Sequence, residues 1–553
     1  MTAAMNVQTG DNASTHAPPV KIASSNAIAE KAVTDTEIEK GRPEEKCKPK
    51  GKGKPEENAQ PTAPKAFGFY AIIVALCLTG LLTALEATIT STALPTITAV
   101  LGGGSGLCGG AVNIEMLVAG RLVQGIGAGA INVLIEIIVC DLLSLRERGR
   151  YLGLMFGMIA VGTVLGPLFG GLIVQHSSWR WVFYLNVPIG GLALVALVLF
   201  LKVKSDNTSN FTSRLKRIDW FGNLIFVLSM VAVLTALSWA GSKYPWSSFH
   251  IIVPLIMALA GGVLFMFFEA SRFCANPTMP LHLFSNRTSG TGFALTFLSS
   301  ISGISPIYFL PVYFQAVLSS TPARAGVQLL PTILGIISGA IVAGVLFSKF
   351  GRYRPLQHAG FTLMVIGFGL LSLLKANSTM GQWVGFQIVG AVGTGLVLPV
   401  LLPSIQAPLN EADTALSTST WAFIRSFGLI WGATILTVAF NNRFNSLAHR
   451  ITDPVVVAEL LGGRAYEHAT KVYMQTITDP ATHAEVVGVF IDSLKLAWYV
   501  SIAFAGLGFV LVVLMKVVPL RKELDTQFGI EESDKSTKTE QPISEQLTLA
   551  TNK

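Results

Sequence analysis

The chain has 553 residues, of which 51% are hydrophobic and 13% are charged, with 40 basic against 32 acidic side chains. Because soluble proteins carry about 25% charged residues, this composition excludes an ordinary soluble domain and indicates a membrane protein. Much of the basic charge lies beside apolar segments, where it sets orientation in a bilayer, so the net charge does not indicate a nucleic-acid partner.

Residues 1–65 are rich in Ala, Thr, Lys, Glu and Pro and show no hydrophobic period. We therefore expect a disordered tail without the apolar core of a signal peptide. The basic stretch 41–54 lies just before the first apolar segment, and the positive-inside rule places this tail in the cytosol.

Twelve apolar segments follow, each about as long as the 20 residues that cross a bilayer. Their expected limits are 67–98, 114–139, 151–173, 182–203, 219–240, 249–269, 289–314, 323–350, 357–375, 382–407, 414–439 and 491–518. Lys and Arg gather in the loops that an inside N-terminus makes cytosolic, whereas the short outside loops hold at most one each. The sequence thus predicts an all-α multi-pass membrane protein.

Two of the predicted outside segments have features of their own. The segment 440–490 carries several basic residues although it falls outside, which is compatible with this topology because long loops cross largely regardless of charge. Asn377, in the sequon Asn-Ser-Thr of another outside loop, is the plausible glycosylation site.

A glycine-rich pattern, G-x8-G-x3-G-P-x2-G-G, marks the third apolar segment. It consists of Gly153, Gly162, Gly166, Pro167, Gly170 and Gly171. Glycine is costly inside a helix in water, but in a bilayer it lets helix backbones approach closely. Pro167 cannot donate a hydrogen bond to the carbonyl of Thr163, so we expect a bend there.

Three ionisable residues lie at membrane depth, where charges are costly and usually functional. They are Glu86, Arg121 and Arg425. Glu86 has no basic residue nearby in its own helix, so it pairs across helices, faces a wet cavity or is protonated. A carboxyl group in an apolar site can load and release a proton near neutral pH, which a proton-coupled carrier needs. The alternative is a structural ion pair.

The arginines also have alternative interpretations. Arg121, with Gln124 close to its face, is either a functional residue or an anchor that reaches toward the membrane surface. Arg425 either faces a central cavity of the protein, or it pairs and packs between helices. We expect Glu136 and Asp141, near the cytosolic end of the second segment, to join an interfacial cluster with the charged residues that follow.

Several segments resemble motifs of the major facilitator superfamily, and more closely those of the fungal drug:proton antiporters with fourteen spans. They are LEATITSTALPTI at 85–97, LVAGRLVQGIGAGA at 117–130, the glycine pattern, SSWRWVFYLNVPIG at 177–190, RIDWFG at 217–222 and PARAGVQLLP at 322–331. The glycine pattern is similar to the antiporter motif of the fifth helix. The resemblance places Glu86 in the first-helix motif, where aspartate is more common, and associates Arg121 with proton transfer.

The chain departs from this family between Gly104 and Ser105, where a second helix, a cytosolic loop and most of a third helix are absent. The family's loop carries G-x-L-A-D-x-x-G-R, whose degenerate counterpart lies only at 344–354, with Ser348 in the aspartate position. A skipped exon, a faulty gene model and a genuine deletion all remain open. About twelve of an expected fourteen spans are therefore present.

The resemblance implies the major facilitator fold, two helical bundles with two extra central helices. The expected parts are a cytosolic tail 1–65, a truncated first bundle 66–203, two extra spans with flanking loops 204–288, a second bundle 289–518 with the outside loop 440–490, and a cytosolic tail 519–553.

The implied function is proton-coupled efflux of small amphipathic molecules, such as drugs, toxins or fungal secondary metabolites. We expect a monomer in the plasma membrane that uses the proton gradient and needs no cofactor or metal. Because the sequence has no nucleotide loop, metal cluster or nucleophile constellation, we do not expect an enzyme. The alternatives are transport of basic amino acids or siderophores across the vacuolar or plasma membrane, and a truncated protein that does not transport.

Overall fold

The computed structural model describes residues 67–101, 114–178, 180–201, 218–240, 244–271, 274, 277–466 and 468–520. The predicted tail 1–65 and nearly all of the predicted tail 519–553 lie outside these residues. Contacts divide the chain into two units, Met1–Ala63 and Pro64–Lys553, and every described helix belongs to the second.

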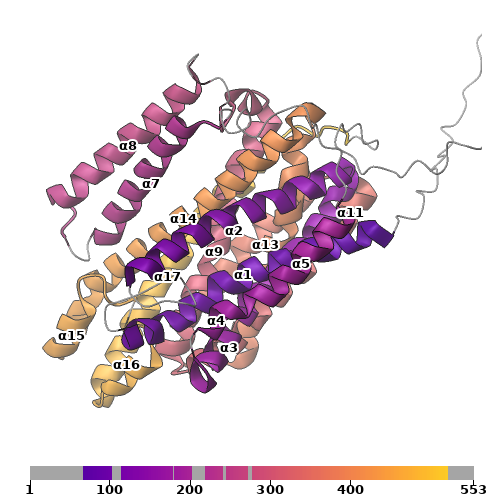
Figure 1. Cartoon of the computed structure of the whole chain (residues 1–553). Coiled ribbons are helices and arrows are strands. Elements are labelled where there is room, and N and C mark those ends of the chain that lie inside the picture. The colour runs from indigo at the N-terminus through magenta and orange to yellow at the C-terminus, as the bar shows by residue number, and fades with distance from the viewer. Residues whose placement is uncertain are drawn as a thin grey trace, which may run out of the picture. The chain divides into compact units, whose positions relative to one another are not determined.

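The described residues are helical and contain no extended strand (Figure 1). The long helices are α1 (Phe67–Leu101), α2 (Ile114–Leu142), α3 (Leu145–His176), α5 (Asn186–Phe200), α7 (Trp220–Trp239), α8 (Phe249–Glu269), α9 (Arg287–Val312), α11 (Leu330–Phe350), α12 (Arg354–Leu371), α13 (Met380–Gln406), α14 (Thr414–Leu447) and α17 (Pro480–Val512). The short ones are α4 (Trp181–Tyr184), η2 (Leu281–Phe284), η3 (Tyr313–Val317), α10 (Pro322–Gln328), η4 (Glu411–Asp413), η5 (Ala448–Arg450), α15 (Pro454–Leu460) and α16 (Lys471–Thr476).

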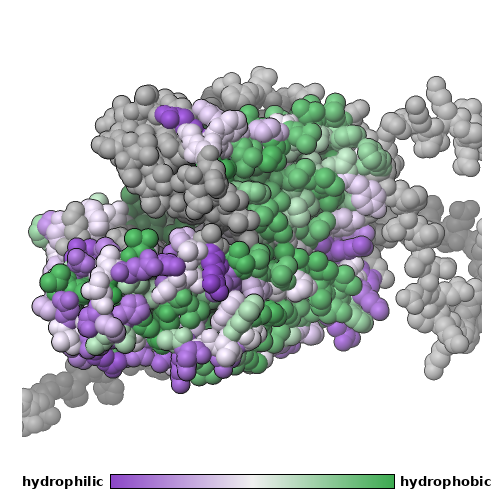
Figure 2. Space-filling model, turned by 90° about the horizontal axis from the view of Figure 1, so that it is seen from below, coloured by the Kyte–Doolittle hydropathy of each residue, from purple (hydrophilic) through white to green (hydrophobic). Residues whose placement is uncertain are grey.

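Within the described part, 10 helical segments are long and apolar enough to cross a membrane. The two other predicted spans, 151–173 and 357–375, coincide with α3 and α12. Figure 2 shows one face on which hydrophobic residues cover a broad area and hydrophilic residues gather mainly toward the ends. The all-α, multi-pass prediction is confirmed.

The boundaries differ most around the predicted outside loop 440–490. There, α14 continues to Leu447 and α17 begins at Pro480, well before the predicted start of the last span. The early start has a local cause, because the Asp479 carboxylate accepts a hydrogen bond from the backbone N–H of Thr482 at 2.8 Å and Pro480 occupies the first turn. This segment is therefore not a continuous loop.

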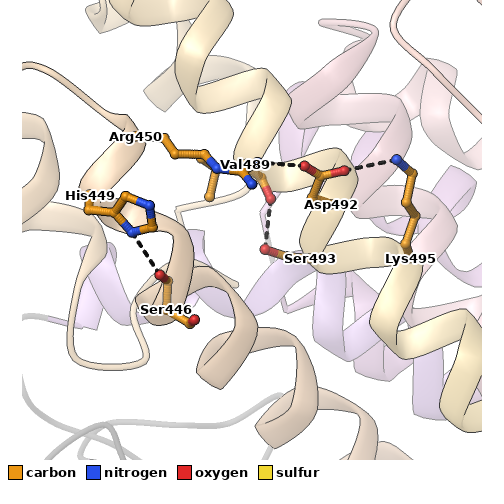
Figure 3. Close-up of polar contacts among 7 residues, drawn as sticks. All are labelled: Ser446, His449, Arg450, Val489, Asp492, Ser493 and Lys495. Atoms are coloured by element: carbon orange, nitrogen blue, oxygen red, sulfur yellow. Dashed lines mark hydrogen bonds and ion pairs between the residues drawn. The ribbon is translucent and has the colours of Figure 1, made fainter.

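Residues 448–466 and 468–479, between α14 and α17, form a folded layer that packs on these two helices and on η3. Leu460, Ala465 and Met474 are fully or almost fully buried in the same apolar cluster as Phe440 of α14. Figure 3 shows the polar contacts at its edge, where Asp492 of α17 binds Arg450 and Lys495, each at 2.8 Å.

The described helices pack in three groups. The helices α3 and α5 both pack on α1 and form a first group with it, with α2 against α1 and α3. The helices α9 and α11–α17 form a second group around its own large apolar cluster. The extra pair α7 and α8 forms a hairpin that touches the second group through α14 (Figure 1). The two main groups meet where α3 packs on α11 and α13 and where α2 packs on α14.

Candidate functional site

An ion pair joins the two main groups within the membrane-spanning helices. The Arg425 Nη2 atom of α14 lies 2.5 Å from the Glu136 Oε1 atom of α2, and the two side chains are 15% and 4% exposed. Both residues lie inside candidate spans. Removing two charges from water costs several kcal/mol each, so a buried pair of this kind persists only when its geometry is good. The pair is therefore a specific contact between the two groups.

Aromatic rings hold the Arg425 guanidinium from two further sides. Its Cζ atom lies 4.8 Å from the ring centroid of Trp421 and 5.2 Å from that of Phe156 in α3. A guanidinium within about 6 Å of a ring face is attracted by the ring quadrupole. Three helices, α2, α3 and α14, thus meet at this one cation.

The pair is not fully satisfied. Within the described residues, the Glu136 Oε2 atom and the Arg425 Nε atom are buried and have no hydrogen-bond partner. A buried polar group without a partner is costly and calls for an explanation, such as a water molecule, an ion or a functional role. This carboxyl group therefore has a free oxygen that can accept a proton.

A second buried contact joins the groups near the end of α2. Arg148, which is 2% exposed, donates to the carbonyl oxygens of Leu143 and Cys140 at 2.9 and 2.7 Å. Its Nη1 atom also donates to the Gln406 Oε1 atom of α13 at 2.7 Å. Arg148 therefore satisfies carbonyl oxygens at the end of α2 and also binds the second group.

Gln406 extends this contact to α14. Its Nε2 atom donates to the Thr418 Oγ1 atom at 2.9 Å, and the Cys140 Sγ atom lies 3.7 Å from the same oxygen. Beside this network, Arg146 donates to the backbone carbonyls of Ser348 and Lys349, each at 2.6 Å. The contacts gather at one end of the bundle, where α2 and α13 end and α3 and α14 begin.

The residues predicted from the sequence have different surroundings in the structure. Arg425 pairs between helices, which is one of its two predicted alternatives. Glu86 lies half-buried in α1 and has a contact of its own, but it is not part of the Arg425 ion pair. Gln124 is half-buried in α2 and also has a contact. The side chain of Arg121 lies outside the described residues.

The prediction for Glu136 was wrong, because its carboxylate binds Arg425 and not the charged residues after α2. A signal was present in the sequence. Glu136 lies six residues before the end of its helix, inside the span, and an arginine at membrane depth needs an acidic partner.

The glycine pattern divides between two neighbours. A Cβ atom at Gly153 would lie 2.7 Å from the Ala340 carbonyl oxygen of α11. At Gly162 and Gly166 it would overlap the Leu81 carbonyl oxygen and the Thr88 hydroxyl of α1, on either side of Glu86. The predicted close approach of backbones is confirmed at these three glycines.

For the other residues of the glycine pattern, the structure describes the helix but not the side-chain surroundings. The helix α3 continues through Pro167 as far as His176. The surroundings of Pro167, Gly170 and Gly171 lie outside the described residues.

Gly162→Leu is expected to destabilise the protein, because the atom that the new side chain meets is a backbone carbonyl that cannot move aside. Overpacking costs about 1–3 kcal/mol and occasionally more. The thermal midpoint of the purified protein measures this loss. Gly191→Leu in α5 is the matched control, since a Cβ there meets nothing within 4 Å. Equal midpoints for the two variants would contradict tight packing at Gly162.

Comparisons with known proteins agree with this architecture. A family model described as the Major Facilitator Superfamily matches residues 66–433. The MFS-type transporter gkaD of Penicillium citrinum is 58% identical over 523 residues, covering 87% of this chain and 90% of that protein. The MFS-type transporter pydD of Acremonium sp is 48% identical and covers 85% and 90%. The MFS-type efflux pump LUC4 of Fusarium sp is 43% identical and covers 86% and 93%.

The first of these alignments also contains a length difference. It spans 523 positions, whereas 87% of the 553 residues of this chain is about 481 residues. About 42 aligned positions of gkaD therefore have no counterpart in this chain.

Proposed function

Because the chain belongs to the major facilitator superfamily, we propose that it is a proton-coupled efflux pump for small amphipathic molecules such as fungal secondary metabolites. The similarity to a pump that is named for efflux, the LUC4 protein of Fusarium sp, supports the direction of transport. The protein is a multi-pass membrane protein, and we propose the plasma membrane as its location.

The proposed mechanism is a rocking of two helical groups about a site between them. The Glu136–Arg425 pair and the Arg148–Gln406 hydrogen bond tie the groups together at one end. The distribution of basic residues predicts that this end is cytosolic. Protonation of Glu136 removes the charge that holds Arg425, which weakens the tie and lets this end open.

The observation that carries this proposal is the buried ion pair between the groups, in which one carboxylate oxygen has no hydrogen-bond partner among the described residues. Glu86, Arg121 and Gln124 remain further candidates for proton coupling or substrate contact. Glu86 lies in the part of α1 against which Gly162 and Gly166 pack. A change in its protonation would therefore act on the contact between α1 and α3.

The proposal is tested in vesicles that contain the purified protein and an amphipathic fluorescent dye. A pH gradient imposed across the membrane is expected to drive dye movement, and an ionophore that dissipates the gradient is expected to stop it. Correct insertion without any gradient-driven movement would contradict the proposal. That result would favour a truncated protein that does not transport, a candidate that the unmatched positions of gkaD support.

Asn377 is expected to carry a glycan, because it is exposed in the turn between α12 and α13 on the predicted outer side. The measurement is the electrophoretic mobility of protein from a eukaryotic host before and after glycosidase treatment. Asn377→Gln is expected to abolish the mobility shift. Asn286→Gln is the control, since Asn286 also lies in a sequon, Asn-Arg-Thr, but faces the cytosol in the predicted topology. A shift that persists in Asn377→Gln would contradict the assignment.

A further inference from the structure

The contacts of the Arg425 guanidinium come from both main groups of helices. Its ion-pair partner Glu136 lies on α2 and the Phe156 ring lies on α3, so both belong to the first group. The Trp421 ring, 4.8 Å from the Arg425 Cζ atom, lies one turn earlier on α14 itself. Residues four apart in a helix share a face, so this last contact needs no other helix. When the two groups separate, Trp421 therefore moves with Arg425, whereas Glu136 and Phe156 stay with the first group.

Both rings are shielded from water where they meet the cation. Trp421 is 0% exposed and Phe156 is 5% exposed, and the Arg425 side chain between them is 15% exposed. The attraction between a cation and the face of a ring is strongest when both are desolvated, and tryptophan is the best of the aromatic side chains. The two ring contacts therefore contribute to where the guanidinium lies.

The strength of these ring contacts depends on the charge of Glu136. While Glu136 is ionised, its negative charge cancels much of the field of the guanidinium at the rings. Once Glu136 is protonated, the guanidinium has no counter-charge and the ring quadrupole attracts the full cation. An uncompensated arginine at membrane depth is costly, so a ring that stays beside it lowers the cost of opening.

The other titratable groups at this end of the bundle interact elsewhere. Among the described residues, Arg425 of α14 is the charged group whose field acts on Glu136. Arg148 of α3 acts instead on Cys140 and Asp141, which lie further along α2. The balance between the ion pair and the ring contacts is therefore set mainly by the protonation of Glu136.

We propose that Trp421 is a positioning residue that holds the Arg425 guanidinium in place while Glu136 is protonated and the two groups are apart. Phe156 has the opposite effect, because its contact with Arg425 exists only while the groups are together and so favours the tied state. The proposal rests on the proposed efflux function and its rocking mechanism. It explains why the cation has one ring on each side of the boundary between the groups.

The test weakens each ring electrostatically and leaves its shape nearly unchanged. Fluorine withdraws electron density from an aromatic face, so a trifluorinated tryptophan in place of Trp421, or a trifluorinated phenylalanine in place of Phe156, attracts a cation less. Opening of the tied end is measured in the full chain in lipid nanodiscs, as the rate at which dithiodipyridine labels the fully buried Cys140. This reagent also reacts with thiols at acidic pH, and mass spectrometry of the labelled peptides identifies Cys140.

Opposite shifts are expected for the two rings. In the unmodified chain, labelling of Cys140 is expected to become faster as the pH falls, because protonation of Glu136 releases Arg425. At one acidic pH, where the reactivity of the thiol itself is the same in all chains, fluorinated Trp421 is expected to slow labelling about three- to tenfold. Fluorinated Phe156, the matched control on the other group, is expected to speed it by up to about threefold.

Unchanged labelling with fluorinated Trp421 would overturn the proposal. A shift in the same direction at both positions would also overturn it, because that is the result expected of two rings that act only through packing. Labelling that does not depend on pH in the unmodified chain would show that protonation does not open this end, and it would overturn the proposal as well. Labelling needs no proton gradient, so a chain that labels as expected but exports no dye would contradict the efflux function and leave the role of Trp421 intact.

Discussion

Glu136→Gln is expected to reduce proton-driven efflux at least tenfold while the protein remains folded. The amide keeps an oxygen that can accept a hydrogen bond from Arg425, but it cannot gain or lose a proton. The variant therefore represents the protonated state permanently. Gradient-driven efflux from vesicles measures the coupled reaction, and exchange of dye between two equal pools without a gradient measures movement of the carrier alone.

The two measurements separate coupling from structure. A coupling role predicts that exchange without a gradient survives in Glu136→Gln, whereas a purely structural role predicts that both activities fall together. Glu86→Gln, assayed in parallel, shows which of the two carboxyl groups carries the proton. Normal gradient-driven efflux in Glu136→Gln would exclude Glu136 and leave Glu86 as the candidate.

Arg425 shows why sequence alone could predict a buried arginine that needs an acidic partner but could not say which acidic residue pairs with it. Hydropathy and span length identified an arginine at membrane depth, because the cost of burying a charge stands out in an apolar segment. Its partner Glu136 is 289 positions earlier in the chain, and only the packing of α2 on α14 brings the two together. Two residues so far apart leave no periodic signal.

The helices themselves were easier to predict than their ends and their neighbours. The spans follow from local hydropathy, and the packing glycines follow from their spacing within one helix. The early start of α17 depends on an Asp479 cap followed by a stretch that includes the half-exposed His483 and Glu485. Such a stretch is too polar for a span and becomes helical because its other face is buried.

The contacts near Arg148 bear on the segment that the family resemblance leads us to expect between Gly104 and Ser105. The loop motif expected there has no first-half counterpart in this sequence, and its second-half position is Ser348. Arg146 binds the backbone at Ser348, and Arg148 binds Gln406. We propose that these arginines supply the tie between the two groups that the missing loop would otherwise make.

Thr418→Cys is expected to lock the pump reversibly. The native Cys140 Sγ atom of α2 lies 3.7 Å from the Thr418 Oγ1 atom of α14, and both residues are fully buried. The two thiols would start close together, and a disulfide between them forms once their Cβ atoms come to about 3.5–4.5 Å apart. Oxidation with iodine, a small apolar oxidant, is expected to lower efflux to near background, and dithiothreitol is expected to restore it.

The control is Thr418→Cys combined with Cys140→Ser. Oxidation is expected to leave its efflux unchanged, because the thiol at position 140 is gone while all other cysteines are kept. Mass spectrometry of the linked peptides measures how much of the protein carries the bond. A complete disulfide with undiminished efflux would mean that α2 and α14 stay together throughout transport. In that case the Glu136–Arg425 pair is a fixed support, and opening takes place elsewhere between the two groups.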